Sequence, residues 1–278
     1  NIFDIISNTI DIKKVIVAAG RINIKYDAEN KPNFAIFKPS EENKNQITLN
    51  QIVILNTSVK YQENNIDIDW YTSKSLLMFK ENNLSINAKL FSEQLEVNKR
   101  DYINKKDVQL HATLSFKKDS IFIQQGSIIH IEEVEVELSG GIFCRNMLDL
   151  KFSCNTQKLA NVIKHTPEHL KAIYSSFQAN GELSCNGSIN GLLSKESNPL
   201  LNMNYHIENG HFTLKSRPFM LKYVSLDGKI SNGEDRNFTT TKIEISQFDA
   251  ETENGSIKGG FTIKNLNKYY LTTNLSSN

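Results

Sequence analysis

Residues 165–169 match a motif that could bind a catalytic metal. His165-Thr166-Pro167-Glu168-His169 fits H-x-x-E-H, a zinc-protease pattern in which two histidines hold the metal and the glutamate activates water. That chemistry needs both histidines on one face of an unbroken helix. Pro167 has no backbone N–H donor, and Thr166-Pro167 is typical of a helix start. We therefore expect a junction between two helices with two exposed histidines, and no metal site.

A second short stretch matches the S-x-x-K signature of β-lactamase-type nucleophiles. It runs from Ser115 through Phe116 and Lys117 to Lys118. In that chemistry the serine begins a helix and the lysine lies one turn later. Here the residues alternate as in a strand and end at a turn, so we interpret them as a strand end with solvated lysines. The sequence also has no G-x-S-x-G motif, phosphate-binding loop or dinucleotide fingerprint.

Two groups of carboxylates could serve a glycosidase or bind Ca²⁺. Asp67 and Asp69 share one face of a predicted strand, and Glu133, Glu135 and Glu137 share a face of another. The glycine and terminal glutamate of an EF-hand are missing, and like charges at alternate positions are typical of a solvated sheet face. We therefore predict no catalytic residue, no metal site, no cofactor and no enzymatic turnover.

The composition excludes a strongly charged partner for the chain as a whole. Its 278 residues include 32 Lys and Arg against 31 Asp and Glu, a formal net charge of +1, so nothing favours nucleic acid. Hydrophobic residues make up 39% and the mean hydropathy is −0.40, which favours half-buried sheets over a thick core. No run of 18 apolar residues occurs.

The cysteines leave the redox compartment open. Cys144, Cys154 and Cys185 lie far apart, without a C-x-x-C pair, which rules out a zinc knuckle. An odd number cannot form a closed set of disulfides. It allows one bridge with one free thiol, and the spacing does not say which pair.

The elements that must position these residues are predicted to be strands. From Leu201 to Ile207 apolar and polar residues alternate, which is typical of a strand with one dry face. Similar strands are expected throughout, including Ile10–Val17, with turns at Ser139–Gly141 and Asn209-Gly210. The apolar positions expected to share one side of the sheet, as candidates for lining a lipid groove, are Met203, Tyr205, Ile207, Phe212, Leu214, Val224, Leu226, Ile243, Ile245, Phe261 and Ile263.

Two short helices are predicted to interrupt the strands near residues 156–179. Thr156–Lys164 has helical spacing of its apolar residues. Thr166 is expected to cap a second helix, with a break at His165–Thr166. The stripe of that second helix is Leu170, Ile173, Tyr174 and Phe177, and Asn180-Gly181 is expected to end it. Such stripes close the end of a sheet or dock a partner or membrane surface.

Four stretches together resemble a known family. They are Gly20–Asp27 with Asn33–Phe37, Ile47–Tyr61, the helical segment before Gly181-Glu182-Leu183, and the C-terminal Gly187, Gly191, Pro199, Asn209-Gly210 and Gly228. This arrangement of strands, acidic turn, helical interruption and glycines is similar to the AsmA family of envelope proteins, relatives of TamB. The likeness covers nearly the whole chain, and its motifs are glycine, asparagine and alternation, with no catalytic signature.

The resemblance implies a fold and a function. AsmA-like proteins are anchored in the inner membrane, extend into the periplasm and curl their strands into an apolar groove. They are implicated in moving phospholipid toward the outer membrane and in outer-membrane integrity. We therefore expect a mainly β protein whose elongated antiparallel sheet curls into an apolar groove, with a β-groove region over residues 1–150, a helical interruption over 151–180 and an AsmA-like β region over 181–278.

The expected function is non-enzymatic handling of phospholipid acyl chains between the two membranes of a bacterial envelope. On this likeness the chain is a fragment, its membrane anchor belongs to a missing N-terminal part, and envelope proteins are its other partners. A secreted β-sandwich or adhesin-like binding module is the first alternative, because alternation alone does not separate a filled core from an open groove. A hydrolase with an unrecognised site is the second.

Overall fold

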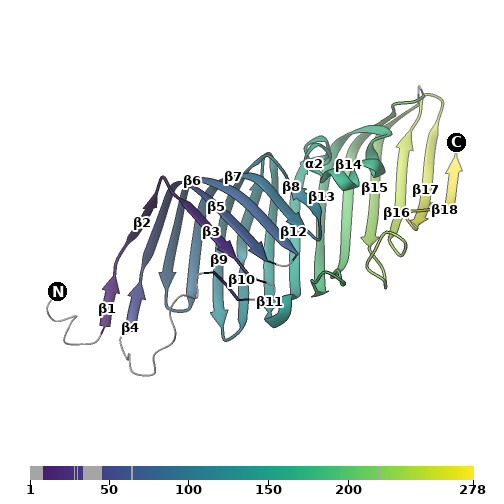
Figure 1. Ribbon diagram of the computed structural model, residues 1–278. Helices are drawn as coiled ribbons and strands as arrows, with labels where there is room; N and C mark the ends of the chain where they lie inside the picture. The colour runs from purple at the N-terminus through teal and green to yellow at the C-terminus, as the bar shows by residue number, and fades with distance from the viewer. Residues whose placement is uncertain (1–8, 28, 30, 34–45, 64, 218) are drawn as a thin grey trace. The chain divides into compact units, whose positions relative to one another are not determined.

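The computed structural model is mainly β (Figure 1). The chain divides into two compact units. The units are Asn1–Glu132 and Glu133–Asn278, called here the N-terminal and C-terminal units. The structure describes residues 9–278 except 28, 30, 34–45, 64 and 218. The predicted mainly β, mostly antiparallel class is confirmed. The boundary falls at a turn before residue 134, so residues 133–150 and the helical segment both belong to the C-terminal unit.

Among the residues that the structure describes, the N-terminal unit has ten strands. They are β1 Thr9–Ile12, β2 Val15–Ala18, β3 Arg21–Lys25, β4 Gln46–Leu49, β5 Gln51–Glu63, β6 Ile66–Lys80, β7 Asn83–Val97, β8 Arg100–Ile103, β9 Lys106–Lys117 and β10 Ser120–Ile131. The strand order is β10-β9-β7-β6-β5-β2, with β3 on β5 and β8 on β7. The pairs β1–β4, β2–β5 and β3–β5 are parallel. The strand predicted at Ile10–Val17 is wrong in length, because it breaks between β1 and β2; the one predicted at Asn33–Phe37 falls outside the described residues after Asn33.

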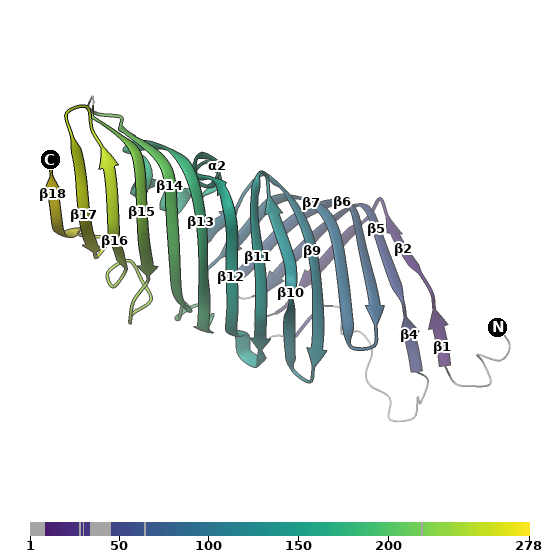
Figure 2. The same cartoon turned by 180° about the vertical axis from the view of Figure 1, so that it is seen from behind.

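The C-terminal unit is an antiparallel meander in sequence order (Figure 2). Its strands are β11 Val134–Phe143, β12 Met147–Lys158, β13 Phe177–Leu192, β14 Leu200–Leu214, β15 Met220–Ser231, β16 Lys242–Glu251, β17 Ser256–Lys264 and β18 Tyr270–Ser277. The single-turn helix η1, Cys144–Asn146, joins β11 to β12. No described helix is long and apolar enough to cross a membrane.

The helical segment lies between β12 and β13. It comprises α2 Leu159–His165, the 3₁₀ turn η2 Glu168–Leu170 and the short helix α3 Lys171–Tyr174. The break predicted at His165–Thr166 is confirmed, because Thr166 and Pro167 have extended backbones. The predicted cap is wrong: the Thr166 hydroxyl donates back to the carbonyl of Val162 at 2.8 Å and so ends α2.

The predicted end of the second helix is also wrong. The helix stops at Tyr174, and Phe177 already belongs to β13. The Phe177 ring lies 6.1 Å from the ring of Phe212 on β14, so cross-strand packing outweighs its helical spacing from Tyr174. Gly181, expected to end the helix, has a φ of 133° inside β13, where a Cβ would lie 2.9 Å from the carbonyl oxygen of Glu208.

Two predicted turns are instead irregularities inside long strands. β14 runs straight through Asn209-Gly210, and Asn209, with a φ of 52°, is an extra residue between the pairs Ile207–Leu226 and Gly210–Val224. β11 runs through Gly140, where a Cβ would lie 2.2 Å from the carbonyl oxygen of the neighbouring strand. A residue that tolerates positive φ serves a β-bulge as well as a turn, so the residue type alone did not distinguish them.

Candidate functional site

The strand registers place the eleven predicted lining residues on one side of the C-terminal unit. Directly opposed residues of antiparallel strands project from the same face of a sheet. One row across β14–β17 is Met203–Ile230–Ile243–Ile263. The next rows are Tyr205–Gly228–Ile245–Phe261 and Ile207–Leu226–Phe248–Gly259. We call this side the C-terminal apolar face.

β-Bulges keep this face apolar where the apolar residues of a strand shift from odd to even residue numbers. On β14 the apolar residues have odd numbers up to Ile207 and even numbers from Phe212 onward. The extra residue Asn209 shifts the strand by one position, so both sets project from the same face. On β15 they are odd at Leu221 and even from Val224, and Tyr223, with a φ of 50°, is the extra residue. Without these two bulges half of each strand would turn its apolar side chains to the opposite face.

Glycines let aromatic rings lie flat on the C-terminal apolar face. A Cβ on Gly228 would lie 2.2 Å from Cζ of Tyr205 on the neighbouring strand, so only glycine leaves room for that ring. Gly187 has the same relation to Phe152, at 2.5 Å. Burial raises the pKa of the Tyr205 phenol to about 12, so this side chain is a neutral part of the apolar face.

Helix α2 covers part of the C-terminal apolar face. Leu159 is buried in the core cluster with Leu183, Ile207 and Val224, and Val162 packs against the same cluster. Figure 1 shows α2 in front of the strands, and Figure 2 shows the strands in front of α2. The apolar residues of α2 therefore pack against the sheet of their own unit.

The end of α2 is held by the residues of the candidate metal motif. Nε2 of His165 lies 2.6 Å from Oε2 of Glu133, and this hydrogen bond lowers the pKa of the Glu133 carboxyl. The expectation of an exposed His165 is wrong, because only 9% of its side chain is exposed. Glu168 instead pairs with Lys171, so the motif is divided between two contacts at the helix junction.

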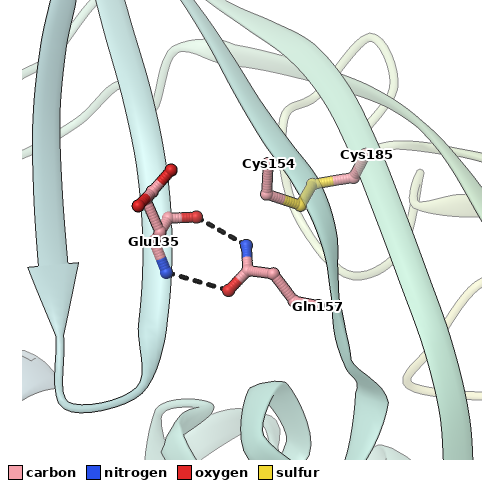
Figure 3. Close-up of a disulfide and its surroundings, with 4 residues drawn as sticks. All are labelled: Glu135, Cys154, Gln157 and Cys185. Atoms are coloured by element: carbon pink, nitrogen blue, oxygen red, sulfur yellow. Dashed lines mark hydrogen bonds between the residues drawn. A yellow bond between two sulfur atoms is a disulfide. The ribbon is translucent and has the colours of Figure 1, made fainter.

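A disulfide and a side-chain amide fasten β11, β12 and β13 beside α2 (Figure 3). Cys154 and Cys185 are opposed residues of β12 and β13 and form the disulfide, while Cys144 is free and exposed. Oε1 of Gln157 accepts from the N–H of Glu135 at 2.8 Å, and Nε2 donates to the carbonyl of the same residue at 2.6 Å. The amide thus completes the β11–β12 ladder beyond its last backbone pair.

The N-terminal unit has an apolar face of its own. Its rows across β5, β6, β7 and β9 are Ile52–Leu77–Ile86–Ala112, Ile54–Ser75–Ala88–Leu110 and Thr57–Thr72–Leu90–Val108. Ile129 and Ile131 on β10 extend the last two rows. No helix belongs to this unit within the residues that the structure describes, so no helix of the unit itself packs on these rows. We call this side the N-terminal apolar face.

Hydroxyl groups on the N-terminal apolar face bind its own backbone and neighbouring side chains. The hydroxyls of Thr72 and Ser75 lie 2.7 Å apart beside a bulge of β6. Nε1 of Trp70 donates to the hydroxyl of Ser92 at 3.1 Å, and that hydroxyl donates to the carbonyl of Ile103 at 3.1 Å. These buried polar atoms therefore have partners and add no unpaired group to the face.

The remaining residues considered for chemistry have structural contacts. The hydroxyl of Ser115, on β9, accepts a hydrogen bond from Nε2 of Gln124 at 2.7 Å. Asp69 pairs with Lys60 at 2.9 Å across β5 and β6. No group of three or more metal-ligating side chains occurs among the residues that the structure describes.

Sequence reasoning expected a β-groove region over residues 1–150 but missed the residues that form the N-terminal apolar face. The candidate lining residues were all taken from residues 203–263, although the same alternation runs through β5–β10. Counting period-2 alternation across β5–β10 would have found it. Comparison with protein-family models, curated proteins and solved structures gives no match.

Proposed function

We propose that this protein handles phospholipid acyl chains without enzymatic turnover, as a periplasmic envelope protein held at the inner membrane, as the resemblance to the AsmA family implies. On this proposal each sheet curls so that its apolar face lines a groove for the chains. The observation that carries the proposal is the N-terminal apolar face, which continues over four or five neighbouring strands and has no described helix of its own unit over it.

The energetics favour an acyl chain as the ligand of such a face. Four strands at about 4.8 Å spacing make an apolar row roughly 14 Å long. Each methylene buried on it contributes about 0.8 kcal/mol, so part of one chain gives useful affinity. The middle of this face is buried, since Leu90 is 9% and Val108 4% exposed, so an acyl chain would lie along its more exposed positions, such as Phe116 at 38%. The buried hydroxyls of the N-terminal apolar face are already hydrogen-bonded within the protein, so a bound acyl chain would not leave them without partners.

Photo-crosslinking in cells tests the proposal. A photoreactive amino acid at Phe116, whose side chain lies on the N-terminal apolar face and is 38% exposed, should give lipid adducts, as should one at Leu110. The matched control is His111, the next residue along β9, which projects from the other side. Equal labelling at all three positions, or none at any, would overturn the proposal.

The same experiment addresses the C-terminal apolar face. Leu226 lies in the cluster that α2 covers, so a photoreactive group there should label less than one at Phe116. This covered cluster resembles the core of an ordinary domain, which favours a binding module as the second candidate for the C-terminal unit. Lipid labelling that shows no preference for either apolar face, together with a specific ligand bound on the opposite, polar side of the sheet, would support the binding-module candidate.

The proposal includes the absence of turnover. A screen with ester, phosphoester and glycoside substrates should give no activity above buffer. Reproducible turnover that one Asp, Glu, His or Ser substitution abolishes would favour the hydrolase alternative instead.

A further inference from the structure

The opposite, polar side of the C-terminal unit carries a depression of about 770 Å³. It spans β15 to β18, and its lining residues other than Phe248 and Gly259 lie off the rows of the C-terminal apolar face. Its lining residues are Tyr223, Ser225, Asp227, Ser246, Gln247, Phe248, Asp249, Glu251, Gly259, Gly260 and Asn274. Hydroxyl, amide and carboxylate groups dominate this lining, so the depression suits a polar ligand.

A bulge and a glycine form the floor of this depression. Between the pairs Ile245–Phe261 and Phe248–Gly259, β16 has two residues where β17 has only Gly260. A Cβ on Gly260 would lie 2.6 Å from the carbonyl oxygen of Ile245, so the neighbouring strand passes close to bare backbone. Polar side chains from both sides therefore surround a floor that carries no side chain of its own.

Tyr223 supplies an aromatic wall. It is the extra residue of the β15 bulge, with a φ of 50°, and 63% of it is exposed. Its ring lies 5.7 Å from the ring of His211. Bulges re-aim side chains next to binding sites, and a tyrosine held at positive φ costs backbone strain. An exposed ring in that conformation beside a polar depression is suited to stacking.

Two of the three carboxylates that line the depression, Asp227 and Asp249, have cationic partners, and the third is Glu251. Oδ2 of Asp249 lies 2.6 Å from Nζ of Lys258, and Oδ1 of Asp227 lies 2.8 Å from Nδ1 of His206. Hydrogen bonds to Glu208 and Asp227 raise the pKa of His206, which favours the charged imidazolium. Paired carboxylates still accept hydrogen bonds but attract a cationic ligand less, so a neutral polyhydroxylated ligand fits better than a basic peptide.

A second, smaller depression of about 240 Å³ adjoins the first. The two share Asp227 and Ser246, and the second extends across β14 to Asn186 and Asn204. These amides are hydrogen-bonded to each other at 3.3 Å. The polar strip therefore has room for several linked units of a ligand.

We propose that this strip binds an oligosaccharide. The apolar C–H face of a pyranose ring would stack on Tyr223, and its hydroxyls would bond to the side chains of Asp227, Asp249 and Asn274. Tyrosine suits such contacts because it offers a large rigid ring with a polar tip. This inference concerns the opposite side of the unit from the lipid proposal and does not depend on it.

Titration calorimetry of the whole chain with maltohexaose, cellohexaose and chitohexaose tests the proposal. At least one should bind, and Tyr223→Asn should weaken that binding at least tenfold. Asparagine tolerates positive φ, so this change removes the ring but keeps the bulge. Tyr269→Asn is the matched control, because Tyr269 is also 63% exposed but does not line the depression, and it should bind as the wild type does.

A second variant and a second ligand keep the test decisive. Asn274→Ala, in the exposed edge strand β18, should weaken the same sugar several-fold even where Tyr223→Asn lowers the yield of folded protein. Binding of hexalysine instead of any sugar, unaffected at Tyr223, would show an acidic patch only and overturn the proposal. So would no binding of the three sugars, or equal losses in Tyr223→Asn and Tyr269→Asn.

Discussion

The two units present similar apolar faces in different environments. In the N-terminal unit the buried apolar side chains are Leu84, Ala88, Leu90 and Val108. In the C-terminal unit they are Leu150, Cys154, Leu159, Ala179, Leu183, Ile207, Val224, Leu226, Ile245 and Ala250. The difference lies in the connections: β12 and β13 are joined by α2 and α3, whereas β9 and β10 are joined by a two-residue turn at Lys118-Asp119. Both faces contain a buried cluster, but only the cluster of the C-terminal unit includes a helix residue, Leu159.

The largest expected effect comes from placing a charge under α2. Val224 is fully buried, so Val224→Asp should cost at least about 4 kcal/mol of the C-terminal unit's stability by burying an unpaired charge. Val59→Asp makes the same change on the half-buried N-terminal apolar face and should cost about 1–2 kcal/mol. Urea unfolding with hydrogen exchange resolved by unit measures both, and equal losses would remove the contrast between the faces.

Breaking the disulfide should destabilise one unit and spare the other. The bridge joins residues 31 positions apart, and loss of that constraint on the unfolded chain costs about 3–4 kcal/mol. The double variant Cys154→Ala, Cys185→Ala should lower the urea midpoint of the C-terminal unit. Fluorescence of Trp70, the one tryptophan of the sequence, follows the N-terminal unit and should show an unchanged midpoint. Cys144→Ala is the control, since its thiol is free and exposed.

The amide of Gln157 offers a finer test of how the C-terminal unit is held beside α2. Gln157→Leu leaves the N–H and carbonyl of Glu135 without their partner and should cost about 1–3 kcal/mol. Gln157→Glu loses the donor and faces the carbonyl with a negative charge, so it should not restore stability. Faster amide exchange at residue 135 is the direct readout, and unchanged exchange in both variants would count against this role.

The smallest expected effect is the pH dependence of the C-terminal unit through His206. Its folded-state pKa is raised by Glu208 and Asp227, so its contribution is fully present below the unfolded pKa of about 6.5 and is lost as pH rises through the folded pKa. Exposed ion pairs contribute about 0.2–1 kcal/mol. His206→Asn should therefore be less stable than wild type at about pH 5.5 and nearly equal at about pH 9. A constant difference across this range would refute the linkage.

Local signals in the sequence predicted the outline of the fold. Period-2 alternation in Leu201–Ile207 predicted β14, and Thr166-Pro167 predicted the helix break, because backbone geometry fixes both patterns within a few residues. The register of successive strands then brings the eleven C-terminal positions to one side. Alternation also ran through β5–β10, so the N-terminal apolar face was present in the sequence.

Only the tertiary structure decided what those signals become. Asn209 and Tyr223 restore the apolar face as bulges, which depends on how neighbouring strands pair and not on the residue itself. Phe177 belongs to strand β13, and not to the preceding helix, because its ring packs against the ring of Phe212 on β14. Whether α2 packs on a face, and which cysteines meet, are set by contacts between residues far apart in the chain. A periodic pattern tells which side of a strand is apolar, but what lies against that side is a non-local choice.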